Sequence, residues 1–150
     1  MFPNFKNRDL ILVQKKGFNQ NIPYLDLDVK VGENEMKRLD VVLFQDEKDQ
    51  ELVKRLIGLP GDFYSFRENK IYIDSIDYDA KENIRAITTP PSELISADAN
   101  LDFFPMKTKG RIPPDYFLLL GDNRENSTDS RTYGLVPNRR LRGKVVKVIF

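Results

Sequence analysis

The sequence contains neither cysteine nor histidine. Without cysteine there is no disulfide framework, and this absence is compatible with either a reducing or an oxidising compartment. The missing residues also argue against the common zinc sites and exclude Ser-His-Asp and Cys-His catalysis. Any hydrolase built on this chain must therefore use a carboxylate or a lysine as its base.

Long apolar runs and an excess of one charge are also absent. No run approaches the ~18 apolar residues of a membrane span. The first residues show no charged and apolar regions of a signal peptide. Lys and Arg total 24 against 23 Asp and Glu, a net charge of +1, which gives no electrostatic case for a nucleic acid partner. We expect either a soluble protein or an anchor outside the printed sequence.

Short apolar and alternating segments separated by Gly, Pro and Asn predict a mainly β fold. The 150 residues suit one domain, or a core with one large insertion. We expect strands at residues 9–14, 25–31, 39–45, 51–57, 63–66, 70–74, 115–120 and 144–150. Periodicity weakens over residues 75–114, and an inserted subdomain is favoured there because structureless loops of that length are uncommon.

Lys54 lies in the middle of the apolar strand expected at 51–57, on the same face as Leu52 and Leu56. A free lysine, with a pKa near ~10.4, is a poor base at neutral pH. Burial can lower that pKa by ~3–5 units, and a neutral lysine can take a proton from a serine hydroxyl. Arg55 has similar neighbours, so periodicity cannot choose between them. The alternative is a solvated charge pair that protects an edge strand.

A polar segment at 121–134 follows the apolar strand at 115–120, and it opens and closes on glycine. If the chain is extended after Arg124, then Ser127, Asp129 and Arg131 share one side. The Ser127 hydroxyl could orient the Lys54 amine, and Asp129 could pair with Arg131.

Asp122, in the same segment, could hold either Arg55 or Arg124. The alternative for the whole segment is an Asx- or Ser-turn loop whose side chains satisfy their own backbone.

Three stretches together carry a resemblance. Residues 54–62 are Lys-Arg-Leu-Ile-Gly-Leu-Pro-Gly-Asp, and residues 121–131 are Gly-Asp-Asn-Arg-Glu-Asn-Ser-Thr-Asp-Ser-Arg. Together with the shorter stretch Leu39-Asp40-Val41-Val42, they resemble the sequence boxes of bacterial type I signal peptidase. That family consists of membrane-bound Ser-Lys proteases that remove signal peptides. The match covers most of the chain apart from residues 75–114.

The resemblance implies roles for particular residues. Lys54 would be the general base, and Ser127 would position its amine. Two ion pairs would support the site, Asp129 with Arg131 and Asp122 with Arg55. The fold would be an antiparallel β-sheet catalytic core, residues 1–74 and 115–150, with a smaller β-rich subdomain inserted at 75–114. No cofactor or metal is implied.

The resemblance also implies partners. Signal peptides of secreted preproteins would dock as an extended strand, with small residues at the first and third positions before the scissile bond. Leu52 and Val53 would pair with that strand, and Met1 and Pro3 would also contact substrate. The second partner would be the lipid surface of the bacterial cell (inner) membrane, with the catalytic domain on its extracytoplasmic side.

The N-terminal end departs from the family pattern. Aligned without gaps, the nucleophilic serine would be the residue immediately before Met1, and we expect the printed chain not to cleave peptides by this mechanism. Asn4 replaces a threonine, and Arg8 and Arg38 replace glycines before aspartate. The alternative is a non-catalytic paralogue that acts as a binding module. A self-cleaving repressor-type protease is disfavoured because no DNA-binding pattern is visible.

Overall fold

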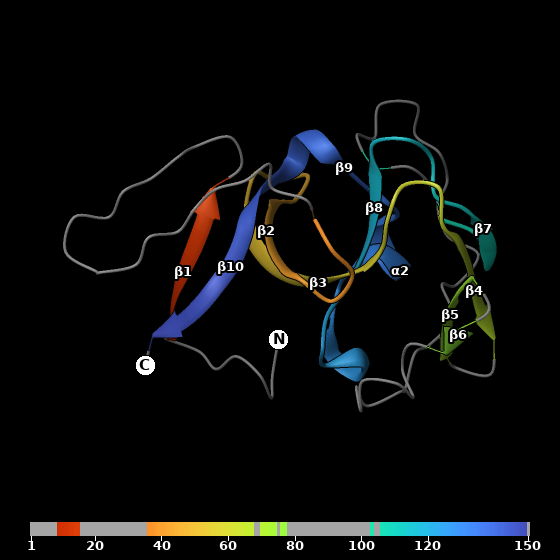
Figure 1. Cartoon of the computed structure of the whole chain (residues 1–150), viewed down its shortest axis with the longest axis horizontal. Helices are drawn as coiled ribbons and strands as arrows, with labels where there is room; N and C mark the ends of the chain where they lie inside the picture. The colour runs from red at the N-terminus through yellow and green to blue at the C-terminus, as the bar shows by residue number, and fades with distance from the viewer. Residues whose placement is uncertain are drawn as a thin grey trace.

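The computed structural model describes residues 9–15, 36–67, 70–74, 76–77, 103 and 106–149. Within these residues the chain is mainly antiparallel β-sheet, as predicted, and forms a six-stranded and a four-stranded sheet. Figure 1 shows the smaller sheet on the side of the molecule where β8 and the short helix α2 lie, while β1 and β10 of the larger sheet lie on the far side. Among these residues, no helix is long and apolar enough to cross a membrane.

The larger sheet has the order β1-β10-β2-β3-β8-β9, and every neighbouring pair is antiparallel. Its strands are β1 (Leu10–Lys15), β10 (Leu141–Ile149), β2 (Val41–Gln45), β3 (Glu51–Gly58), β8 (Tyr116–Leu120) and β9 (Val136–Pro137). Three short helices follow β8 or flank β9: η1 (Arg124–Asn126), α2 (Ser130–Tyr133) and η2 (Asn138–Arg140). Five of the expected strands thus appear here, while the strand expected at 25–31 lies outside the described residues.

The smaller sheet has the order β6-β5-β4-β7. Its strands are β6 (Ile76–Asp77), β5 (Lys70–Ile73), β4 (Phe63–Arg67) and β7 (Lys109–Arg111). The expected hairpin is present as β4 and β5, and β4 also pairs with β7. The smaller sheet therefore draws strands from both sides of the expected boundary at residue 75, while residues 78–102 lie outside the described chain.

Two apolar clusters lie on the two faces of the larger sheet. One face of β3 and β8 contributes Ile57, Leu118 and Leu120 to a cluster with side chains of the smaller sheet. The other face contributes Leu56 and Leu119 to a second cluster. Both faces of these strands are therefore buried, which explains why residues 116–120 form a continuous apolar run instead of an alternating one.

A backbone strain marks the entry to β2. Leu39 has a φ of 74°, a left-handed conformation that favours glycine. The expectation that Arg38 occupies a glycine position was wrong by one residue, because Leu39 directly precedes Asp40. Arg38 instead pairs through Nη2 with Asp62 Oδ1 at 2.5 Å, which links β2 to the turn before β4. Leu39 N donates to Leu56 O at 2.7 Å, and this contact holds the strained residue against β3.

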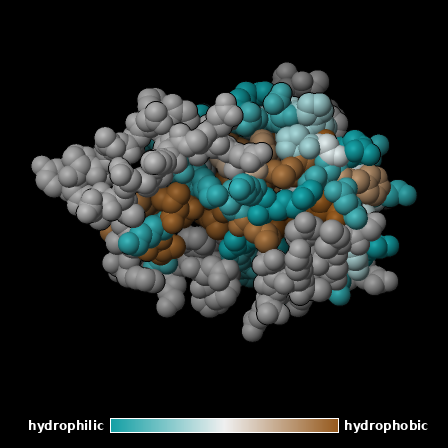
Figure 2. Space-filling model, viewed as in Figure 1, coloured by the Kyte–Doolittle hydropathy of each residue, from teal (hydrophilic) through white to brown (hydrophobic). Residues whose placement is uncertain are grey.

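Most large apolar side chains are buried, but a few reach the surface. Leu10, Phe63 and Val146 are exposed, on β1, β4 and β10 respectively. Figure 2 shows apolar atoms beside a hydrophilic band across the middle of the face that Figure 1 presents.

Candidate active site

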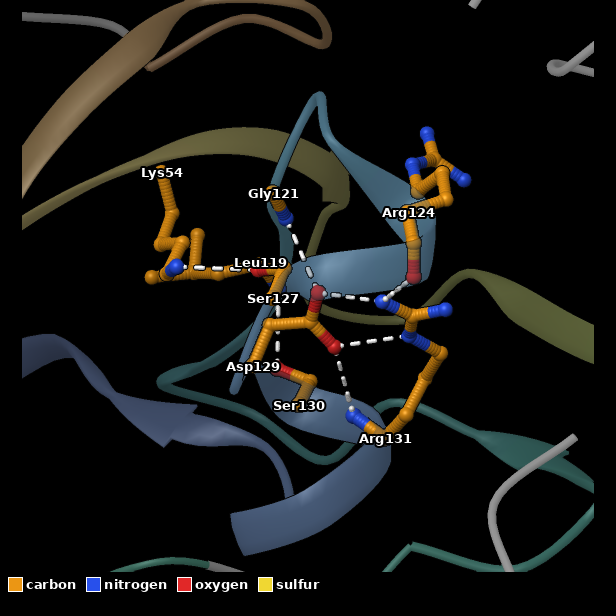
Figure 3. A network of polar contacts seen from close by, with 8 residues as sticks. All are labelled: Lys54, Leu119, Gly121, Arg124, Ser127, Asp129, Ser130 and Arg131. Atoms are coloured by element: carbon orange, nitrogen blue, oxygen red, sulfur yellow. Dashed lines mark hydrogen bonds and ion pairs between the residues drawn. The ribbon is translucent and has the colours of Figure 1, made fainter. Parts of the chain in front are cut away.

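The Lys54 side chain meets the Ser127 hydroxyl at the centre of the larger sheet. Lys54 Nζ donates to Ser127 Oγ at 2.9 Å, although the two residues are 73 positions apart. Figure 3 shows the amine pointing from β3 toward the segment that joins η1 to α2. Both residues are half-buried. The structure thus brings together the lysine and the serine to which the sequence assigned catalytic roles.

The surroundings of Lys54 favour its neutral form. Lys54 lies opposite Val42 of β2, which is buried. Burial away from water lowers the pKa of the Lys54 amine, and this is the largest effect on it. Asp129 raises that pKa, Arg131 lowers it, and Asp122 raises it. The charged neighbours thus act in both directions, and the net pKa stays below the ordinary lysine value.

Arg55 points away from this amine, because successive side chains of β3 lie on opposite faces. Its Nε and Nη2 donate to the two carboxylate oxygens of Asp122, each at 2.7 Å. Its Nη1 donates to Leu39 O at 2.8 Å. The structure confirms Arg55 as a partner of Asp122, one of the two that the sequence left open. This bidentate pair ties the start of the polar segment to β3 and to the strained residue before β2.

Asp129 caps α2 and organises the end of the polar segment. Its carboxylate accepts from Arg131 Nε and Nη2, each at 2.8 Å, and from Arg131 N at 3.2 Å. An extended chain after Arg124 would have put Ser127, Asp129 and Arg131 on one side. The chain is not extended as far as Arg131, which lies in α2. The ion pair forms because the aspartate is the helix N-cap and the arginine lies two residues further on.

Gly121 makes the close approach of Ser127 possible. A Cβ placed at residue 121 would lie 2.5 Å from Ser127 Cβ, closer still to Ser127 Oγ, and 3.5 Å from Lys54 Nζ. Gly121 is not among the glycines with a positive φ, so clearance and not backbone conformation requires glycine here. Any side chain at residue 121 would push the serine away from the lysine.

The sequence missed the parts played by Gly121 and Ser130. Ser130 Oγ accepts from Leu119 N at 2.9 Å, and Asp129 Oδ2 accepts from Gly121 N at 3.0 Å. A helix signal was present in the sequence: an aspartate suited to an N-cap at 129, and Gly134, whose φ of 100° ends α2. The contact between Ser130 and β8 depends on tertiary packing and left no pattern in the sequence.

The expected substrate residues are only partly placed. Met1 and Pro3 lie outside the described residues. Leu52 and Val53 lie on β3, half-buried, and Leu52 packs against the second apolar cluster. β3 pairs with β2 from Glu51 onward, but its pairing with β8 begins only at Arg55. Among the described strands, the β8 side of residues 51–54 therefore has no partner.

A half-buried amine held by a hydroxyl, with two ion pairs behind it, is a constellation suited to a lysine-dependent hydrolase. Burial lowers the pKa of the amine, which is the direction that a base requires. The hydroxyl fixes the direction of the amine. The carboxylates are engaged by arginines and hold the backbone of the segment in place. The site thus combines a candidate base with a rigid support.

Comparison with known proteins gives the family. Residues 1–150 match the signal peptidase family, peptidase S26, so the chain belongs to that family. It is 29% identical to signal peptidase I of Bacillus caldolyticus over 147 residues, which are 97% of this chain and 71% of that protein. It is 35% identical to signal peptidase I of Bacillus licheniformis over 118 residues, 77% of this chain and 60% of that protein. The chain thus spans less than two thirds of the second relative.

A solved structure is also similar. The crystal structure of a signal peptidase I from Enterococcus faecalis V583 superposes with a TM-score of 0.51 at 26% sequence identity. The match covers 75% of this chain and 97% of that one. The family assignment and the mainly β fold are therefore supported by both sequence and structure.

Proposed function

We propose that this chain is the catalytic part of a serine endopeptidase that cleaves N-terminal signal peptides from exported preproteins. The observation that carries the proposal is the 2.9 Å contact between Lys54 Nζ and Ser127 Oγ in a half-buried site. The proposed location is the extracytoplasmic side of the bacterial cell membrane. Family membership and the names of the relatives support this function.

In the proposed mechanism, Lys54 is the general base. A neutral amine that donates one hydrogen to Ser127 has its lone pair directed elsewhere, toward an attacking serine hydroxyl. That hydroxyl loses its proton to Lys54 as its oxygen bonds to the scissile carbonyl carbon. The ammonium then returns the proton to the leaving amine, and an acyl-enzyme remains for water to hydrolyse. Ser127 positions the base and does not attack.

The substrate would bind along the open edge of β3. Leu56 N donates to Asp40 O and Leu56 O accepts from Leu39 N, so the backbone N–H and C=O of Leu56 face β2. Because these groups alternate in direction along a strand, those of Val53 face the opposite side. An extended peptide could pair there with the N–H and C=O of Val53, which is a β-augmentation mode. This edge ends at Lys54 and would bring the peptide to the base.

Cleavage of a signal-peptide substrate tests the proposal. The proposal needs an attacking serine, so the assay uses a chain to which a serine has been added before Met1. We expect Lys54→Ala to abolish cleavage. We expect Ser127→Ala to lower kcat by about 10²-fold without unfolding, since a misplacement of about 1 Å in a catalytic constellation costs about that much. Lys48→Ala, an exposed lysine in the β2–β3 turn, is the matched control and should keep full activity.

The outcomes separate the alternatives. Full turnover by Lys54→Ala would rule out Lys54 as the base. If Ser127→Ala cleaved at the wild-type rate, Ser127 would have a turn-forming role and would not position the base. If the printed chain without the added serine cleaved at the same rate, the nucleophile would lie within residues 1–150. If no version cleaved but a signal peptide still bound, the chain would be a non-catalytic binding module.

A further inference from the structure

We infer that Ser130 is a positioning residue for the Lys54 site. Its hydroxyl accepts a hydrogen bond from β8 where no partner strand is present among the described residues, and this bond holds the end of β8, at Gly121, against Ser127. The inference rests on the proposed role of Lys54 as general base. It concerns a residue whose described side-chain hydrogen bond is to β8 and not to Lys54.

Part of one edge of β8, beyond Phe117, has no partner strand among the described residues. Leu119 lies opposite Leu56 of β3. Leu56 N bonds to Asp40 O and Leu56 O accepts from Leu39 N, so the backbone of Leu56 faces β2. In an antiparallel ladder this makes Leu56 and Leu119 a pair without mutual hydrogen bonds. The N–H of Leu119 therefore points to the β9 side of β8.

On that side, β9 pairs with β8 only at Tyr116 and Phe117. Beyond this point the side chains of Ser130 and Asp129 take the place of a strand. Ser130 Oγ accepts from Leu119 N at 2.9 Å, and Asp129 Oδ2 accepts from Gly121 N at 3.0 Å. These are alternate residues of β8 and its extension, spaced as a partner strand would contact them. Figure 3 shows both contacts beside the Lys54–Ser127 pair.

The position of β8 matters for the base because Gly121 contacts Ser127 directly. The space at residue 121 is so tight that a single Cβ would collide with Ser127. A small displacement of the end of β8 would therefore displace the serine or open a gap beneath it. Ser130 is fully buried, so water cannot readily replace its hydroxyl as the acceptor for Leu119 N.

Asp129 has several roles, since it also binds Arg131 and raises the pKa of Lys54. Ser130 offers a cleaner test. Its hydroxyl is neutral and its described contact is with the backbone of Leu119. Changing Ser130 therefore alters the position of β8 without adding or removing a charge near the base.

The experiment uses NMR on the isotope-labelled 150-residue chain and needs no catalytic activity. Wild type, Ser130→Ala, Ser130→Thr and Thr132→Ala are compared by amide hydrogen exchange and by the pH titration of the Lys54 side chain. In Ser130→Ala we expect the Leu119 amide to exchange about tenfold faster, as for loss of one buried hydrogen bond. We also expect Lys54 to titrate at higher pH, because loosening beneath Ser127 admits water. Ser130→Thr keeps a hydroxyl and should restore both values.

Thr132→Ala is the matched control, since Thr132 is exposed on the same helix. It should change neither value. A purely structural role for Ser130 would lower global stability but leave the Lys54 titration of the folded protein unchanged, and that result would overturn the inference. If Ser130→Ala does not fold, amide hydrogen exchange in the wild-type chain still tests the inference. A Leu119 amide that exchanges as fast as exposed amides would overturn the inference. A wild-type Lys54 with an ordinary pKa would instead count against the proposed function.

Discussion

The close approach at Gly121 gives a prediction whose size follows from the structure. In Gly121→Ala the new methyl group would lie 2.5 Å from Ser127 Cβ, whereas real Cβ contacts are essentially never under 3.0 Å. Ser127 must retreat, and the Lys54–Ser127 hydrogen bond at 2.9 Å then lengthens past the range in which such bonds form, up to ~3.2 Å. A misplacement of about 1 Å in a catalytic constellation costs about 10²-fold in rate.

The fold should also lose stability, by roughly 1–3 kcal/mol, because an extra methyl group overpacks the site. Chemical denaturation of four proteins measures this: wild type, Gly121→Ala, Ser127→Gly and the double variant. Ser127→Gly removes both atoms with which the methyl group collides. Gly121→Ala should therefore be less costly in that background, with a coupling free energy of about 1–2 kcal/mol.

Gly61→Ala provides the control for a glycine replaced elsewhere. Gly61 has a φ of 89°, and a Cβ added to it would meet no atom within 4 Å, so its cost of about 1–2 kcal/mol comes from backbone conformation alone. It should be additive with Ser127→Gly and leave the rate of cleavage unchanged. Additive free energies for Gly121→Ala and Ser127→Gly, together with a full rate for Gly121→Ala, would refute the clearance argument.

Three further predictions concern other parts of the molecule. At Leu39, whose φ is 74°, Leu39→Gly should be more stable than Leu39→Ala by about 1 kcal/mol, because alanine keeps the backbone strain; thermal unfolding that ranks alanine above glycine would contradict the strain. Tyr133 has a buried hydroxyl with no hydrogen-bond partner among the described residues, and its ring packs on Phe44 and Phe103. Tyr133→Phe should therefore keep the packing and raise the free energy of unfolding by about 1 kcal/mol, and a loss on denaturant titration would reveal a partner for that hydroxyl. Burial lowers the pKa of Lys54 in the folded state, so between that pKa and the unfolded value of ~10.4 the unfolded chain binds more protons than the folded chain. The free energy of unfolding of wild type relative to Lys54→Met should therefore rise with pH over that window. A difference that does not depend on pH would argue against a lowered pKa.

The sequence predicted the strands better than the loops, and the reason is physical. The apolar residues at 116–120 form a strand buried on both faces, and a continuous apolar run is the pattern that such a strand leaves. The alternation in residues 51–57 placed Lys54 and Arg55 on opposite faces, although it could not say which of them would meet the polar segment. That choice depends on where β8 ends, which is set by tertiary packing.

The polar segment shows where sequence reasoning stopped. An extended chain and a turn-rich loop were both considered after Arg124, and neither is a helix, although the Asp129 cap and Gly134 favour the short helix that forms. The Ser127 contact was expected because the resemblance to signal peptidase implies it, and a serine hydroxyl can orient a lysine amine. Gly121 is needed because a side chain there would collide with Ser127. The bond from Leu119 N to Ser130 depends on which part of the β8 edge lacks a partner strand. Neither feature produces a pattern in the sequence.

The titration of Lys54 tests the central claim most directly. Selective isotope labelling of lysine, with Lys54→Met to assign the signal, allows the side-chain carbon shifts of Lys54 to be followed against pH. The account predicts a Lys54 pKa below the ordinary value of about 10.4 in the folded wild-type chain, because burial disfavours its ammonium form. A pKa at or above that ordinary value would leave the amine charged at neutral pH and would contradict its role as the base.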